Sequence, residues 1–177
     1  AELSEPIKFK VAGFWWPPSL ETEFWQAVKE RGLENRVEVL GPVTEQDLIK
    51  LYRGARALIF PHQDPINMPV MEAAAHGCPI VIQQGIDLFT HGVDSFLPDC
   101  GPLRHATGSS ADIHRPTDLT KFIDCTDQLV RDERLAFKIG RKASELMKNY
   151  SWRHHSQRLN DLIQEGNIGL IKAVERF

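Results

Sequence analysis

The sequence predicts an α/β protein: a doubly wound parallel sheet with helices on both faces, followed by C-terminal helices. Three observations lead to this prediction. Short β-rich runs alternate with helical patterns between residues 7 and 84. Two of these runs, ALIF and PIVI, are apolar throughout, as strands are when both faces of a parallel sheet are covered. From Thr117 onward the patterns are helical only.

The first half of the chain supplies four strands with helices between them. In order, we expect a strand in IKFKVAGF (7–14), a helix in 20–32, a strand in RVEVLG (36–41), a helix after Thr44, a strand in RALIFP (56–61), a helix after residue 66 and a strand in PIVIQ (79–83). Thr44 and Asp47 form a capping-box pattern at the start of the second helix. RALIFP and PIVIQ are expected to be buried strands.

The second half of the chain has a different pattern of residues. Residues 85–116 are rich in Gly, Pro, Ser and His, and only SADI (110–113) suggests an edge strand. Three helical patterns follow, the third beginning at Ser151 and ending in an amphipathic tail. The basic face between Arg131 and Arg153 favours a solvated helix surface, with peripheral membrane contact as the alternative.

Composition and charge exclude several classes of protein. The 177 residues suit one domain, and a net charge of -3 gives no bias toward nucleic acid. The apolar runs are too short to span a bilayer and the start lacks a signal peptide's apolar core, so we expect a soluble, cytoplasmic chain. The three cysteines are widely spaced without a CxxC pair, which predicts neither a disulfide framework nor a metal site.

The stretch PHQDPINMPVMEAAAHGCPIVI (61–82) contains two carboxylates in different settings. Asp64 follows the third strand, at the sheet edge where ligands bind in open parallel sheets. Asn67 suits the N-cap of the next helix, whose free N–H groups and dipole favour a phosphate. Glu72 lies about 7 Å further along the helix axis, at 1.5 Å per residue, where it could reach a ribose. Spacing alone leaves an alternative open, in which Asp64 is a cap and Glu72 a solvated residue.

The run DPINMPVMEAAAHGCPIV resembles the signature of retaining family 4 glycosyltransferases of the GT-B fold. That signature typically reads Glu-Gly-Phe-Gly-x-Pro-x-x-Glu-Ala-x-Ala-x-Gly-x-Pro-Val. The upstream run NRVEVLGPVTEQDLIKLYRGARALIFP and the later GSSADIHRPTDLTKFIDCTDQLVRDERL also resemble that family, so the resemblance covers roughly residues 33–153. It implies a Rossmann-like, nucleotide-sugar-binding domain of a hexosyltransferase-type enzyme.

The resemblance also implies roles for single residues. Glu72 would bind the ribose hydroxyls of a nucleotide-sugar donor, and Asp64 would be the catalytic residue that faces the transferred sugar. The other donor-binding residues would be Ile66, Asn67, Met68, Gly41 and Val43. Among these, the backbone N–H groups of Asn67 and Met68 would meet the sugar and pyrophosphate, and the GPV turn would border the base. The nucleoside diphosphate sugar is a substrate, and no cofactor or metal is implied.

Departures from the family pattern limit what is expected of the isolated chain. Asp64 is one methylene shorter than the usual Glu, and Pro65 removes a backbone donor from the loop. The family's opening strand and helix, with an Arg and a Lys for the pyrophosphate, have no match here, nor has the N-terminal domain that holds the acceptor. We therefore expect residues 1–177 to form one donor-binding domain, the C-terminal half of a two-domain enzyme. Alone it should be inactive, and its acceptor is unknown.

Two other functions are alternatives to this one. The altered loop also suits a non-catalytic nucleotide- or carbohydrate-binding partner domain. A receiver-type signalling domain would need clustered acids after the first strand, and GFWWPPS contains none. For Trp15 and Trp16 in that loop, packing is favoured over stacking on a base.

Overall fold

Parallel strands alternate with helices in the computed structural model, which describes residues 7–15, 17–60, 68–83, 88–98, 104–105, 114–115, 119–150 and 157. The strands are β1 (Phe9–Ala12), β2 (Val37–Gly41), β3 (Leu58–Phe60), β4 (Ile80–Ile82), β5 (Arg104–His105) and β6 (His114–Arg115). The α-helices are α1 (Ser19–Glu30), α2 (Glu45–Gly54), α3 (Met68–Ala75), α4 (Thr120–Arg131) and α5 (Glu133–Met147). Short 3-10 helices lie at Glu34–Arg36 and Lys148–Tyr150. SADI, Ser151 and the tail lie outside the described residues.

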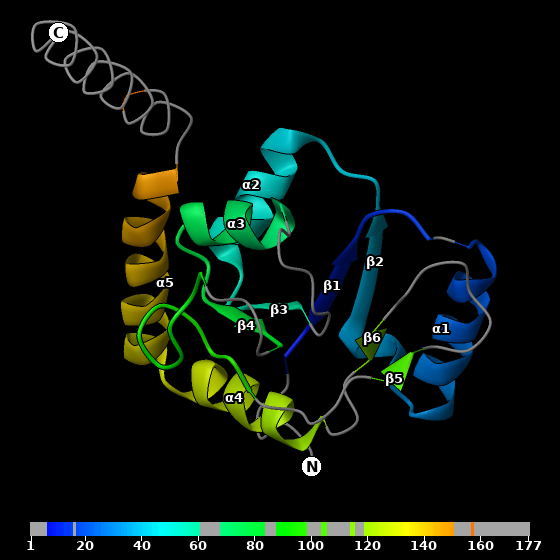
Figure 1. The fold of residues 1–177 in the computed structure, drawn as a ribbon. Helices are drawn as coiled ribbons and strands as arrows, with labels where there is room; N and C mark the ends of the chain where they lie inside the picture. Colours follow the sequence, from blue (N-terminus) through cyan, green and yellow to red (C-terminus); the bar gives the residue numbers. More distant parts are fainter. Residues whose placement is uncertain are drawn as a thin grey trace, which may run out of the picture.

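The strands confirm the predicted α/β fold class, but the described strands form separate pairs and not one sheet. β1 pairs with β2 and β3 pairs with β4, both in parallel, whereas β5 and β6 form an antiparallel pair. In Figure 1, α2 and α3 lie above the β3–β4 pair and α4 lies below it, so helices cover both faces. In the part of the chain that the structure describes, β1 and β3 are not joined by ladder hydrogen bonds. The expected single sheet is therefore interrupted between them.

The far side of β4 is paired by a single residue of the following loop. The Phe96 N–H donates to the Ile80 carbonyl at 2.9 Å, and the Ile82 N–H donates to the Phe96 carbonyl at 3.0 Å. This pairing fell in a segment without a strand pattern, so the sequence did not predict it. β4 thus has neighbours on both edges.

The buried apolar side chains gather around β4 and the helices that follow it. They form two clusters, one with Tyr52, Val70, Ala73, Ala74, Cys78, Ile80, Ile82, Phe89, Ala143 and Met147, and one with Val81, Phe96, Phe122, Cys125, Leu129, Ala136 and Ile139. β4 is fully buried, as predicted. β3 is not: all three of its residues are only partly buried. The prediction for β3 was wrong because, among the described strands, β3 pairs with β4 on one edge and with no strand on the other.

The termini of α2 and α3 follow their sequence signals. The Thr44 Oγ1 accepts a hydrogen bond from the Asp47 N–H at 3.2 Å, which confirms the predicted cap of α2. At the end of α3, Gly77 has a φ of 77°. The N–H groups of Gly77 and Cys78 return to the carbonyls of Ala74 and Ala73, both at 2.9 Å. This is a Schellman motif, which requires the left-handed backbone that glycine adopts readily.

The helix α5 fixes α3 in place from its C-terminal end. The Ser144 Oγ donates to the Ala75 carbonyl at 3.0 Å across the two helices. Gly140 packs directly against the Gly77 carbonyl. These contacts hold the C-terminus of α3 against α5. They therefore set the direction in which the N-terminus of α3 points.

Part of the predicted basic face lies on α5. Arg134, Lys138 and Lys142 are exposed, and Lys142 pairs with Glu145 at 2.8 Å. Within the described residues, no helix is long and apolar enough to cross a membrane.

Candidate functional site at the carboxyl edge of the strands

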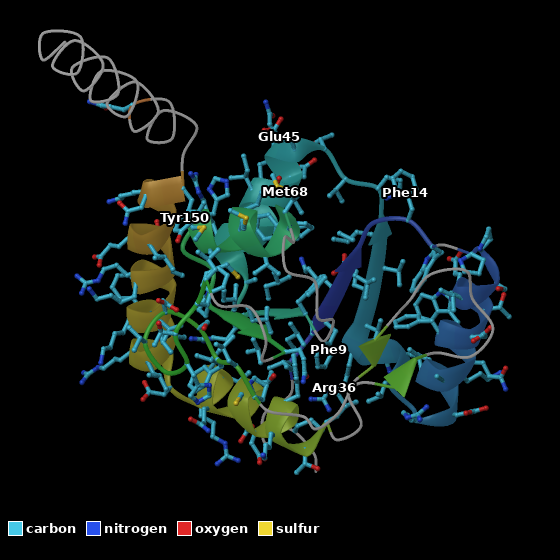
Figure 2. The ribbon with its side chains drawn as sticks, in the orientation of Figure 1. Phe9, Phe14, Arg36, Glu45, Met68 and Tyr150 are labelled. Atoms are coloured by element: carbon cyan, nitrogen blue, oxygen red, sulfur yellow. The ribbon has the colours of Figure 1, made fainter. Side chains whose placement is uncertain are left out.

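The starts of α2 and α3 and the end of β1 lie on one side of the molecule. Figure 2 shows Glu45, Met68 and Phe14 along its upper side, with Phe9 and Arg36, at the opposite ends of β1 and β2, on its lower side. Ligands in open parallel sheets bind beyond the carboxyl ends of the strands. The helix terminus that the sequence singled out therefore lies at the edge where a ligand is expected.

The loop that leads into this helix terminus is not described. Asp64, Ile66 and Asn67 fall within residues 61–67, outside the described part of the chain. α3 begins at Met68, the residue after the predicted N-cap. The roles given to Asp64, Ile66 and Asn67 stay predictions.

Glu72 is partly buried on α3 and is held by a neighbouring tyrosine. Tyr52 of α2 is 7% exposed, and its hydroxyl donates a hydrogen bond to the Glu72 carboxylate. The Tyr52 ring also stacks on His76, with ring centroids 6.3 Å apart and planes at 17°. Glu72 is therefore not a freely solvated residue on an exposed stripe. A carboxylate fixed by one donor keeps further oxygen lone pairs for a ligand.

The contact with Glu72 affects the pKa of Tyr52. Burial, together with smaller effects of the Glu72 charge, the Cys78 side chain and the hydrogen bond to Glu72, raises the pKa of Tyr52 to about 12. Because the pKa of Tyr52 is higher in the folded state than in the unfolded state, the protonated hydroxyl favours folding. This contribution to the free energy of unfolding is complete below pH 10. It is lost as the pH rises from 10 to about 12.

Replacing Glu72 by Gln should lower the pKa of Tyr52, because the amide carries no charge to oppose the tyrosinate. Tyr52 and Tyr150 are the two tyrosines of the chain, so a Tyr150→Phe background isolates the signal of Tyr52. The measurement is tyrosinate absorbance against pH, with circular dichroism followed in the same samples. An unchanged titration after Glu72→Gln would show that the two side chains do not interact.

Met68 shares a face of α3 with Glu72. The two residues are four positions apart, the spacing that places helix side chains next to each other. Met68 is 57% exposed at the first position of the helix. Its side chain is thus open to a ligand at the helix terminus.

Gly41 and Val43 lie at the end of the other strand pair. Gly41 ends β2 with a φ of 65°, and its carbonyl accepts a hydrogen bond from the Gly13 N–H at 2.9 Å. This bond ties together the carboxyl ends of β1 and β2. Val43 is partly buried in the turn that follows. Because β2 is not in the same ladder as β3, the described structure does not join these two residues to Glu72 by hydrogen bonds.

Two residues near this edge were missed by the sequence reasoning. Tyr52 lies in the helix predicted after Thr44, and nothing in the sequence indicated its bond to Glu72. Gln83 follows β4 directly, is 3% exposed, and has a side-chain oxygen without a hydrogen-bond partner in the described structure. A buried acceptor of this kind is costly when it is unsatisfied. Its place after a strand was the signal that could have drawn attention to it.

Trp15 packs within the protein, as the favoured interpretation expected. Its ring lies 5.0 Å from that of Phe24 in α1, at an interplanar angle of 42°. Trp16 lies outside the described residues.

Across the described residues there is also no group of three or more His, Cys, Asp or Glu that could hold a metal ion.

Comparison with known proteins identifies the family. The model for glycosyl transferases group 1 matches residues 1–105, more than half of the chain. The chain belongs to the group 1 glycosyl transferases. Similar members of known function include the D-inositol 3-phosphate glycosyltransferases of Corynebacterium efficiens and Corynebacterium jeikeium. They are 25% identical over 137 residues and 26% identical over 140 residues, in each case 77% of this chain.

The solved structures show the fold of this chain. Anabaena HepE, solved in complex with UDP-glucose, superposes with a TM-score of 0.69 at 18% identity, over 89% of this chain and 41% of HepE. The C-terminal domain of the group 1 protein LpcC from Francisella tularensis gives a TM-score of 0.60 at 16% identity, over 81% of this chain and 86% of that domain. The fold is that of a Rossmann-like C-terminal domain of a GT-B glycosyltransferase. The chain spans 29% of the length of the Corynebacterium efficiens relative.

Proposed function

We propose that this chain is the donor-binding domain of a glycosyltransferase. The longer enzyme would transfer a hexose from a nucleoside diphosphate sugar to an acceptor, with retention at the anomeric carbon. The observation that carries the proposal is Glu72, fixed by Tyr52 on the helix whose N-terminus lies at the carboxyl edge of the strands. HepE, a structural neighbour, was solved with UDP-glucose, which supports a nucleotide sugar as the ligand.

The proposed donor pose follows from the charges at this edge. The diphosphate would lie at the N-terminus of α3, where the helix dipole supplies about half a positive charge and the first N–H groups are free to donate. Glu72 would accept hydrogen bonds from the ribose hydroxyls. Asp64 would face the transferred sugar. The same dipole would stabilise the departing nucleoside diphosphate, so the proposal needs no cofactor.

Calorimetry with UDP and UDP-glucose on two variants tests this pose. Glu72→Gln exchanges an accepting oxygen for a donor, so UDP should bind more weakly by about 1 to 3 kcal/mol, the range for a charged hydrogen bond. Asp64→Asn should leave UDP binding nearly unchanged and weaken only UDP-glucose. Glu23→Gln, an exposed carboxylate on α1, serves as the control and should change neither.

The outcomes separate the proposal from its alternatives. Equal losses for both ligands in both variants would mean that the donor lies elsewhere. Binding of UDP with no added affinity for UDP-glucose, and no effect of Asp64→Asn, would favour a non-catalytic nucleotide-binding domain, which the loss of a backbone donor at Pro65 also suits. The isolated chain should show no sugar transfer, since we propose that the acceptor binds in the rest of the enzyme.

A further inference from the structure

The outer side of α5 presents an aromatic ring between basic side chains. In Figure 1, α5 lies at the left edge of the molecule. Its inner side is buried against the core and consists of Ala136, Ile139, Gly140, Ala143 and Met147. On the outer side, Phe137 is 73% exposed. Arg134 and Arg141, three positions before it and four after it, are also exposed and are its neighbours along the helix. Covering this apolar ring would be favourable because it is in contact with water.

The charge of this outer side is opposite to the charge of the whole chain. The exposed charged residues of α5 and the turn after it are basic at five positions and acidic at two, namely Arg134, Lys138, Arg141, Lys142 and Lys148 against Glu133 and Glu145. The chain as a whole has a net charge of -3. The outer side of α5 is therefore a local concentration of positive charge.

The acidic residues on this side are already paired. Glu133 lies 3.4 Å from the Arg56 guanidinium, and Glu145 lies 2.8 Å from the Lys142 ammonium. In the part of the chain that the structure describes, neither Arg134 nor Lys138 forms an ion pair. These two cations are therefore available to an external anion.

The combination of an exposed ring and surplus cations distinguishes between classes of partner. Single-stranded nucleic acid binds in basic grooves with several aromatic platforms, whereas here one ring projects from a helix. An anionic bilayer supplies phosphates for basic side chains and, just beneath them, an apolar layer for an aromatic ring. Arg and Lys suit this boundary because their stems are apolar and their ends are charged. The sequence had left membrane contact as the alternative to a solvated face, and the exposure of Phe137 favours it.

We propose that the outer side of α5 docks on the surface of a bilayer that contains anionic lipids. Phe137 enters the boundary between headgroups and acyl chains, and Arg134, Lys138 and Arg141 lie at the lipid phosphates. The inner side of α5 stays packed on the core, so docking requires no unfolding. α5 contacts the C-terminal end of α3, whereas the donor is proposed at the N-terminal end. The membrane and the donor can therefore be bound together, and this proposal does not depend on donor binding.

Co-sedimentation with vesicles tests the proposal. The chain of 177 residues is mixed with vesicles of phosphatidylcholine alone, and with vesicles that contain about one third of the anionic lipid phosphatidylglycerol. At about 0.1 M salt we expect the chain to sediment with the anionic vesicles only. At about 1 M salt the Debye length falls from about 10 Å to about 3 Å, so this binding should be lost.

Two substitutions on α5 and their matched controls locate the contact. Lys138→Gln should weaken binding to anionic vesicles about fivefold, the contribution of one cation near such a surface. Lys29→Gln, which removes an exposed cation from α1, should change it little. Phe137→Ala should weaken binding at least about tenfold, and Phe137→Trp should retain it because indole rings suit membrane interfaces. Phe14→Ala, which removes a ring that is 85% exposed at the end of β1, should have little effect.

Three results would overturn the proposal. The first is no sedimentation with anionic vesicles at about 1 mM lipid, a concentration at which even one buried acyl chain gives binding. The second is an equal loss of binding in the control variants, which would place the contact on another face. The third is tighter binding to a single-stranded oligonucleotide that the same α5 variants weaken, which would assign the face to nucleic acid. Circular dichroism on every variant checks folding, and UDP titrations on the same samples report donor binding separately.

Discussion

Replacing Gly140 by Ala is expected to destabilise the chain by about 3 kcal/mol, at the upper end of the usual cost of overpacking. A Cβ at this position would overlap the Gly77 carbonyl oxygen, and would lie 3.0 Å from the Gly77 carbonyl carbon and 3.3 Å from the Pro79 Cδ. These atoms belong to backbone and to a proline ring, so they cannot move aside as a flexible side chain would. The Schellman motif at the end of α3 would have to shift.

Gly54→Ala is the matched control for this substitution. Gly54 also lies in a helix, but a Cβ there would meet nothing within 4 Å. Alanine favours helix over glycine by up to about 1 kcal/mol, so Gly54→Ala should be neutral or stabilising. Urea unfolding followed by circular dichroism gives both values. Equal stabilities of the two variants would show that α5 does not pack on α3 as described.

Replacing Ile139 by Ala should cost about 2 to 5 kcal/mol, the range for cavities left by large aliphatic residues. Ile139 of α5 is fully buried in the cluster that contains Leu129 and Val81. It joins the helical layer to β4, the most buried strand. Its loss therefore removes contacts from two layers at once.

Phe137→Ala on the same helix provides the contrast. Phe137 is 73% exposed, so its removal should change the free energy of unfolding by no more than about 0.5 kcal/mol. Phe137→Ala removes a larger side chain than Ile139→Ala does. A smaller loss of stability for Phe137→Ala would therefore reflect its exposure and not its size. A Phe137→Ala loss as large as that of Ile139→Ala would indicate that the exposed ring is covered in solution.

The parts of the fold that follow local signals could be predicted from the sequence. Thr44 starts α2 and Gly77 ends α3 because the interactions involved span only a few residues. The alternation of strands and helices and the burial of β4 followed from residue pattern. These features depend on neighbours in the chain, which the sequence displays directly.

Features that depend on distant neighbours could not be predicted. Whether β3 is buried depends on a strand beside it, and the apolar run LIF is the same with or without that strand. The bond between Tyr52 and Glu72 joins two helices, and the pairing of Phe96 with β4 joins a strand to a loop. For the candidate site, the sequence predicted a helix terminus at the carboxyl edge of the strands, and the role of Glu72 stays a prediction. The sequence did not reveal what holds Glu72 in place.

Cys78, at the junction of α3, β4 and α5, has a consequence for covalent labelling. It is 1% exposed, and burial raises the pKa of its thiol to about 11. At pH 7 only about one thiol in ten thousand would be the reactive thiolate. Iodoacetamide should therefore modify Cys78 only in molecules whose junction has opened. The rate of alkylation at the Cys78 Sγ therefore reports how often this junction opens. Mass spectrometry can measure that rate without an engineered probe.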